Sequence, residues 1–388
     1  MMKRLLTIGL AFSLALTASA GPFCMHEEET PAQKKHKRDL EDDAKLGSEY
    51  AKQIDKELKP SKNEALVARV QKIGKEMADI ANITMVRVSW GDKRLNPFTY
   101  TFKVVEGKDV NAFSLPGGTI YVYEGLLQYA ETDDELAGVL AHEVAHASLR
   151  HIATLRQESS KLSSFTIPLI LISILTANPA LASATGMLGQ AIGSGWSVKA
   201  ETAADLAAFD YMRQSKYDPA GILTLMERLA YDERNRPQFD WGIYRTHPPS
   251  SERASALRDL LAEVKHPIRR SVVTTTLRAT PKPQEDGSVQ LVFAGRRLFT
   301  FYGEHAKERA EESAKAINAC FDRVPKLHEV TAFDGDSVEY QGAPLIQITD
   351  ADEKGSGKPL SELLQSTLGA VKAGIYDLRY RVWDFFAR

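Results

Sequence analysis

The chain has 388 residues, 43% of them hydrophobic and 26% charged, with a formal net charge of −2. This composition is typical of a soluble folded protein, and the length suffices for two domains. The near-neutral charge provides no basic surface for a polyanion, so we expect no nucleic-acid partner.

The amino terminus has the features of a cleavable signal peptide over residues 1–20. Lys3 and Arg4 precede an apolar stretch at 5–16, and Ala18-Ser19-Ala20 forms an A-x-A cleavage signal. The apolar stretch is too short to favour a membrane-spanning helix. We therefore expect export to the periplasm of a Gram-negative bacterium.

The two cysteines are Cys24 and Cys320. Gly21-Pro22-Phe23 is a poor lipobox, so we do not expect a lipid anchor at Cys24. An exported protein tolerates disulfides, and whether these two cysteines form one stays open.

Residues 119–123 read Thr-Ile-Tyr-Val-Tyr and predict a strand, with a loop before it at 111–118. An exposed strand edge can hold an extended peptide by backbone hydrogen bonds. We expect a substrate to bind along Asn111, Ala112 and Phe113. The alternative, that these residues only pack, also stays open.

A helix is predicted after Thr132-Asp133-Asp134-Glu135, a capping-box sequence with acids in the first turn. This helix contains His142-Glu143-Val144-Ala145-His146, an H-E-x-x-H motif. Positions i and i+4 share one helix face, so both imidazoles can bind one zinc ion, with Glu143 beside them as general base. His151 lies nine residues from His142, on the opposite side of a continuous helix. We expect it to be structural or to support a ligand.

A catalytic zinc ion usually has three protein ligands. Glu201 is the best candidate for the third, on a second helix that runs to about Met212. Asp205 follows at i+4 and can accept the other ring N–H of a ligand histidine. The alternative for this acidic pair is a solvated helix face, which the presence of the H-E-x-x-H motif makes the less favoured interpretation.

An apolar segment at 165–175 lies between the two helices. It is shorter than a normal membrane-spanning helix, so we expect a buried helix or a lid, with a membrane-contacting surface as the alternative.

Downstream, helices are predicted from Asp218-Pro219 to about 230 and from about 250 to 264. His266-Pro267 and Pro281-Lys282-Pro283 bracket a domain boundary. The segment from 275 to 388 predicts a smaller αβ domain of unknown role. Its elements are a hairpin at 289–301 that turns at Ala294-Gly295, a helix at 306–321, a strand at 344–349 and a long helix from 359. The apolar stripe on that last helix predicts packing on a sheet or on another helix of the domain, with a partner helix as the alternative.

Four segments together resemble the zinc metallopeptidases of the CAAX prenyl protease, HtpX and BepA type. These are Asn111 to Gly118, His142 to His151, Glu201 to Asp205, and Thr246-His247-Pro248-Pro249 with Arg253. The resemblance covers roughly residues 38–265. It implies an α+β fold, in which a mostly helical gluzincin-type domain with a small edge sheet spans residues 21–268.

The resemblance implies a zinc metalloendopeptidase with one Zn²⁺ per chain, bound by His142, His146 and Glu201. Glu143 would act as general base on a zinc-bound water. His247 and Arg253 would stabilise the developing oxyanion. Alternatively, His247 binds zinc in a resting state and switches the site off.

The substrates implied are polypeptides, in particular misfolded envelope proteins, which makes the chain a protein quality-control hydrolase. A membrane surface or outer-membrane assembly factors are further candidate partners, with the C-terminal helix as docking element. The alternative function is a chaperone-like or regulatory binding module with a latent, His-switched zinc site.

Overall fold

The computed structural model describes residues 29–158, 196–235, 247, 251–332 and 335–378. The predicted signal peptide, Cys24 and the apolar segment at 165–175 lie outside these residues. Cys320 is buried.

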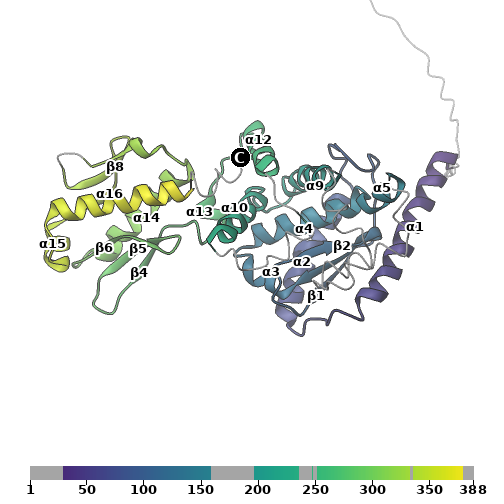
Figure 1. The fold of residues 1–388 in the computed structure, drawn as a ribbon, viewed down its shortest axis with the longest axis horizontal. Helices are drawn as coiled ribbons and strands as arrows, with labels where there is room; N and C mark the ends of the chain where they lie inside the picture. The colour runs from purple at the N-terminus through teal and green to yellow at the C-terminus, as the bar shows by residue number, and fades with distance from the viewer. Residues whose placement is uncertain (1–28, 159–195, 236–246, 248–250, 333–334, 379–388) are drawn as a thin grey trace, which may run out of the picture. The chain divides into compact units, whose positions relative to one another are not determined.

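The first part of the described chain is mostly helical (Figure 1). Its helices are α1 (Pro31–Ile54), α2 (Glu64–Ala81), α3 (Glu124–Tyr129), α4 (Asp133–Ser148), α5 (His151–Glu158), α9 (Trp196–Met212), α10 (Ala220–Asn235), α12 (Ser251–Glu263) and α13 (Arg270–Val273). Its strands are β1 (Thr101–Val105), β2 (Ala112–Ser114) and β3 (Thr119–Tyr123), and a short 3-10 turn, η1 (Pro116–Gly118), joins the last two.

The three strands form a sheet in the order β1-β3-β2. β3 is confirmed as predicted, but the segment before it is not all loop, because β2 pairs with β3 in antiparallel register, Ala112 opposite Val122. The connection at η1 is tight, since Gly117 has a φ of 76° and a Cβ there would lie 2.4 Å from the Cα of Ala44 on α1. Among the described strands of this sheet, β2 is an edge strand next to α4.

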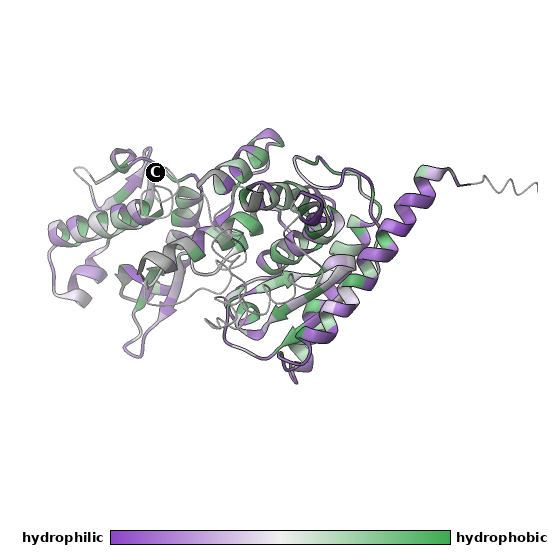
Figure 2. Ribbon diagram, turned by 45° about the vertical axis from the view of Figure 1, so that its right-hand side comes forward, coloured by the Kyte–Doolittle hydropathy of each residue, from purple (hydrophilic) through white to green (hydrophobic). Residues whose placement is uncertain are grey.

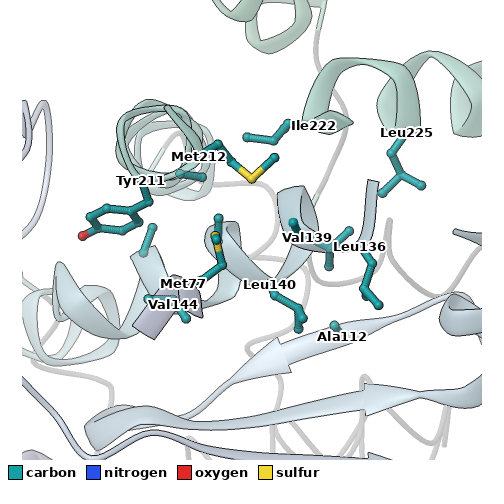
Figure 3. Close-up of a cluster of buried hydrophobic side chains, with 14 of the residues drawn as sticks. Met77, Ala112, Leu136, Val139, Leu140, Val144, Tyr211, Met212, Ile222 and Leu225 are labelled. Carbon is teal, nitrogen blue, oxygen red and sulfur yellow. The ribbon is translucent and has the colours of Figure 1, made fainter. Parts of the chain in front are cut away.

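Helix α4 runs through the centre of this part and packs against α2, α9 and α10. Figure 3 shows side chains of α4 meeting those of α9 and α10, with Ala112 of β2 nearby. The contact residues labelled there include Leu136, Val139, Leu140, Val144, Met212 and Ile222. Nearly every side chain of α4 is buried, so the helix is held rigidly from several sides.

The start of α4 follows the predicted cap only in part. Thr132 is the N-cap and accepts a hydrogen bond from the Glu135 backbone N–H at 3.3 Å. The Glu135 carboxylate, however, accepts from the backbone N–H of Glu131 at 2.9 Å rather than from that of Thr132. It also pairs with buried Arg228 of α10. A tertiary ion pair therefore displaces the reciprocal half of the capping box.

The C-terminal part contains two three-stranded antiparallel sheets with helices against them (Figure 1). The elements are β4 (Thr280–Pro283), β5 (Val289–Phe293), β6 (Arg296–Phe301), α14 (Ala306–Asp322), η2 (Leu327–Glu329), β7 (Val330–Thr331), β8 (Ser337–Tyr340), β9 (Ala343–Gln347), α15 (Asp350–Ser356) and α16 (Leu360–Tyr376). The predicted hairpin, helix, strand and long helix are all present. The residues at 281–283, predicted only as a boundary, form part of the edge strand β4. Proline is tolerated on an edge because no partner needs its missing N–H.

Buried hydrophobic residues fall into separate clusters before and after about residue 275. The largest runs from Val70 to Val273, and another runs from Leu277 to Leu378. Helix α1 is the long helix at the right of Figure 2, where hydrophilic and hydrophobic residues are interspersed along it. Its residues Leu46, Tyr50 and Ile54 are buried at helical spacing. The predicted α+β fold class is confirmed. The domain limits 21–268 and 275–388 stay a prediction.

None of the helices in the described ranges combines the length and the hydropathy that crossing a bilayer requires.

Candidate metal centre

Helix α4 presents His142 and His146 on one face, as the i, i+4 spacing predicts. Their Nε2 atoms lie 3.0 Å apart, and both rings are largely buried. Glu143 is 2% exposed, and its Oε2 atom has no hydrogen-bond partner in the part of the chain that the structure describes. A buried carboxylate oxygen without a donor is costly, so this atom is suited to accept a proton from a water in the site.

Helix α9 brings a carboxylate to the same point. The Glu201 Oε2 atom lies 3.2 Å from His142 Nε2, and its Oε1 atom lies 3.3 Å from His146 Nε2. The predicted third ligand therefore meets the two histidines across the α4–α9 contact, although 55 residues separate it from His146.

The arrangement fits a metal ion by its chemistry. One ligand atom each from His142, His146, Glu201 and His247 lies within 4.8 Å of the others. Lone pairs of two imidazoles and a carboxylate that face one another repel unless a cation or a proton lies between them. Histidine nitrogen with one carboxylate is a donor set typical of catalytic zinc sites. These four residues could hold one such ion.

Asp205 and Arg253 form a second layer behind these residues. The Asp205 Oδ1 atom lies 2.9 Å from His142 Nδ1, on the side of the ring away from Glu201, and forms an ion pair only with a protonated imidazole. Arg253 of α12 donates to both Asp205 oxygens, from Nε at 2.7 Å and from Nη2 at 2.9 Å. Its Nη1 lies 3.1 Å from Glu201 Oε2.

These charges set the ionisation of Glu201. Burial alone would raise its pKa, but the charges of His247 and Arg253 outweigh burial and hold that pKa well below the usual range. Glu201 is therefore a carboxylate at neutral pH, which is the form that binds a metal.

His247 lies in the site, as predicted. Its Nδ1 atom is 3.1 Å from Glu201 Oε2, and its Nε2 atom is 3.2 Å from Glu143 Oε1. The same Nε2 atom is 3.3 Å from the backbone oxygen of Ala112 on β2. His247 thus contacts the ligands, the predicted base and the edge strand together.

His151 differs from the prediction, which placed it across a continuous helix. Helix α4 ends at Ser148, and Arg150 adopts a φ of 53° before α5 starts. This left-handed residue interrupts the helix, so the next side chain does not follow the periodicity of α4. The Nδ1 atom of His151 consequently lies 2.9 Å from His146 Nδ1. The motif spacing alone carries no signal for this break, since helix termination at a non-glycine residue depends on tertiary contacts.

The model of peptidase family M48 matches residues 64–261, just over half of the chain. The chain belongs to peptidase family M48. The family prediction from the short motifs is thereby confirmed, and membership in a family of metallopeptidases implies a metal at the His/Glu cluster.

Curated relatives are named proteases. Metalloprotease LoiP of Escherichia coli is 32% identical over 180 residues, which are 43% of this chain and 65% of LoiP. Metalloprotease YcaL of the same organism is 28% identical over 212 residues, 52% of this chain and 74% of YcaL. The Beta-barrel assembly-enhancing protease of Yersinia pestis is 29% identical over 181 residues, 44% of this chain and 37% of that protein. The chain thus spans less than two thirds of LoiP and of the Yersinia protein.

Proposed function

We propose that this chain is a zinc-dependent endopeptidase that hydrolyses peptide bonds of misfolded envelope proteins. The observation that carries the proposal is the convergence of His142, His146 and Glu201 on one point, with the free oxygen of Glu143 beside it. The names of the M48 relatives support the reaction class.

In this proposal His142, His146 and Glu201 hold the metal, one ion per chain. Zinc there would act as a Lewis acid and lower the pKa of a water in the site. Glu143 takes the proton of the attacking water and delivers it to the leaving amine. Asp205 orients His142, and Arg253 holds Asp205 and Glu201 in place. Because the donors of Arg253 named above all reach these two carboxylates, its geometry supports a positioning role more than the predicted oxyanion role.

The substrate would bind along β2. In an antiparallel pair, residues alternate between those that bond to the neighbouring strand and those whose backbone groups face away. Asn111 bonds to β3 through its carbonyl, which accepts from the backbone N–H of Tyr123 at 3.0 Å. Alternation then turns the backbone of Ala112 outward, and His247 lies against that outward oxygen. Of the predicted substrate strand, Ala112 is the residue best placed to bond to an extended peptide.

His247 would bind the metal in a resting state and leave the site when a substrate enters. His247 belongs to the ligand cluster, and its Nε2 atom lies against the Ala112 oxygen, so both observations support this role. The other role, a donor to the developing oxyanion, predicts the opposite effect of removing the imidazole.

A periplasmic location fits the signal-peptide pattern of residues 1–20 and the naming of several relatives after β-barrel assembly. Outer-membrane assembly partners, and docking through the C-terminal helix, belong to this proposal.

A casein-cleavage assay on metal-analysed protein tests the function. We expect about one zinc per chain, cleavage that a chelator abolishes and added zinc restores, and a loss of about 10²–10⁴-fold in Glu143→Gln. Glu143→Gln should keep its zinc, because Glu143 is not a ligand. His247→Ala should raise basal cleavage if His247 is a resting ligand, and lower it if His247 is an oxyanion donor. Absence of cleavage by fully metallated wild type and His247→Ala would instead favour the chaperone-like binding module.

A further inference from the structure

A chain of contacts leads from one backbone carbonyl to the candidate ligand His146. The backbone oxygen of Trp90 lies 3.3 Å from His151 Nε2, and His151 Nδ1 lies 2.9 Å from His146 Nδ1. His146 Nε2 then faces Glu201 and His142. His151 is 4% exposed, so water has little access to replace these partners.

The direction of each hydrogen bond follows from the Trp90 carbonyl, which can only accept. A neutral His151 therefore carries its one proton on Nε2, which leaves a lone pair on its Nδ1 atom. That lone pair can only accept from the Nδ1–H of His146. His146 is thereby held in the tautomer whose Nε2 lone pair points at the metal cluster, which is the form a ligand histidine needs.

The backbone around His151 is built to keep this geometry. The segment at 90–96 closes the end of α4, because the Asp92 N–H donates to the Leu149 oxygen at 2.8 Å and Asn96 Nδ2 donates to the Ser148 oxygen at 2.7 Å. Gly91 has a φ of 109°, and a Cβ there would lie 3.0 Å from the His151 ring. Only a glycine therefore allows the Trp90 carbonyl to approach the ring this closely.

Arg150 holds the break between α4 and α5. Its guanidinium is buried and donates to Asp43 at 2.6 Å and to Asp92 at 2.9 Å. A non-glycine residue at a φ of 53° is mildly strained, and these two ion pairs hold it there. The break is what turns His151 back toward His146.

We propose that His151 is a positioning residue that selects the metal-binding tautomer of His146 and fixes its ring through the Trp90 carbonyl. The proposal rests on the proposed function, since it takes His146 as a ligand. The two histidines of the motif are thus supported differently: a charged carboxylate, Asp205, lies behind His142, and a neutral imidazole relay lies behind His146.

Two substitutions separate hydrogen bonding from packing. His151→Phe keeps an aromatic ring against Trp90, whose own ring centroid lies 5.1 Å from that of His151, but it removes the acceptor. His151→Asn removes the ring but keeps an acceptor near the position of Nδ1. Ser148→Ala is the matched control, because its hydroxyl bonds to Ala145 and Tyr211 at the same end of α4 without contact to a ligand atom.

The measurement is zinc affinity, by competition with a chromophoric chelator, beside the thermal unfolding of each metal-free protein. We expect His151→Phe to bind zinc about 10–100-fold more weakly than wild type, the cost typical of losing a partner behind a ligand histidine. His151→Asn should stay within about threefold of wild type, and Ser148→Ala should lower stability without changing zinc affinity.

The inference is overturned if His151→Phe keeps wild-type zinc affinity, if His151→Asn is as weak as His151→Phe, or if affinity merely follows unfolding temperature across the three variants. In each case wild type still binds zinc and the proposed function stands. If wild type itself binds no zinc, the proposed function and this inference fail together.

Discussion

Arg253 lies between two buried carboxylates, Glu201 and Asp205, and is itself 4% exposed. These three buried charges stabilise one another only while all of them are present, because a buried charge without its partner is costly. A bound dication would compensate the same carboxylates. The contribution of Arg253 to stability should therefore depend on the metal.

We predict that Arg253→Met lowers the unfolding free energy of the chelator-treated protein by about 3–5 kcal/mol, the typical cost of breaking a buried ion pair. Saturating zinc should reduce this loss. Arg253→Lys keeps the charge but not the two-pronged contact, and should lie between wild type and Arg253→Met. Denaturant unfolding with and without zinc measures both effects. An equal loss in the two conditions would contradict the coupling.

At the scale of elements, α4 approaches α10 closely because a glycine lies at their contact. A Cβ at Gly138 would lie 2.8 Å from a side-chain carbon of Ile222 and 2.9 Å from its backbone nitrogen. Helix α4, which carries His142 and His146, can therefore move toward α10 only if α10 moves as well. By contrast, a Cβ at Gly369 on α16 would meet no atom of the described chain within 4 Å.

We predict opposite effects for one substitution at these two glycines. Gly138→Ala should destabilise the protein by about 1–3 kcal/mol, since overpacking outweighs the better helix propensity of alanine. Gly369→Ala should stabilise it by about 0.5–1 kcal/mol, because only the propensity changes. Urea unfolding of the two variants measures both. A stabilising Gly138→Ala would contradict the prediction, because the α4–α10 contact would then accommodate the added methyl group.

At the scale of the whole molecule, one carboxylate anchors the segment between the two hydrophobic clusters. Glu131 precedes α4 and accepts hydrogen bonds from Thr274, Thr275 and Thr276, and it pairs with Arg228. Burial alone would raise its pKa, but these hydrogen bonds and Arg228 outweigh burial and lower the pKa of Glu131 to about 2.

We predict that this anchor is lost in acid. An unfolded glutamate titrates near pH 4.3, so the stabilisation from Glu131 is complete above that pH and disappears as the pH falls toward 2. Glu131→Gln should cost about 1–3 kcal/mol at pH 7, and its difference from wild type should narrow as the pH falls from about 5 to about 2. Urea unfolding at several pH values measures the difference. Glu263→Gln, at an exposed surface pair with Arg87, should change little at any pH. A pH-independent cost for Glu131→Gln would refute the prediction.

Local patterns in the sequence predicted the elements that depend on neighbours in the chain. The capping sequence that begins at Thr132 predicted α4, Ala294-Gly295 predicted the hairpin turn, and the i, i+4 histidines predicted a shared helix face. These are short-range properties of backbone geometry, so they can be read without a fold. The acidic pair Glu201 and Asp205, considered beside the H-E-x-x-H motif, predicted the third ligand, and the structure brings Glu201 to the histidines.

Other features depend on groups that are distant along the chain, and only the tertiary structure decided them. The register of β2 on β3 selected Ala112 as the outward residue, and Arg228 displaced the reciprocal half of the cap. The ion pairs of Arg150 set the break that turns His151 onto His146. A sequence motif indicates which ligand residues a site contains. Their orientation depends on backbone angles and on partners that packing brings together.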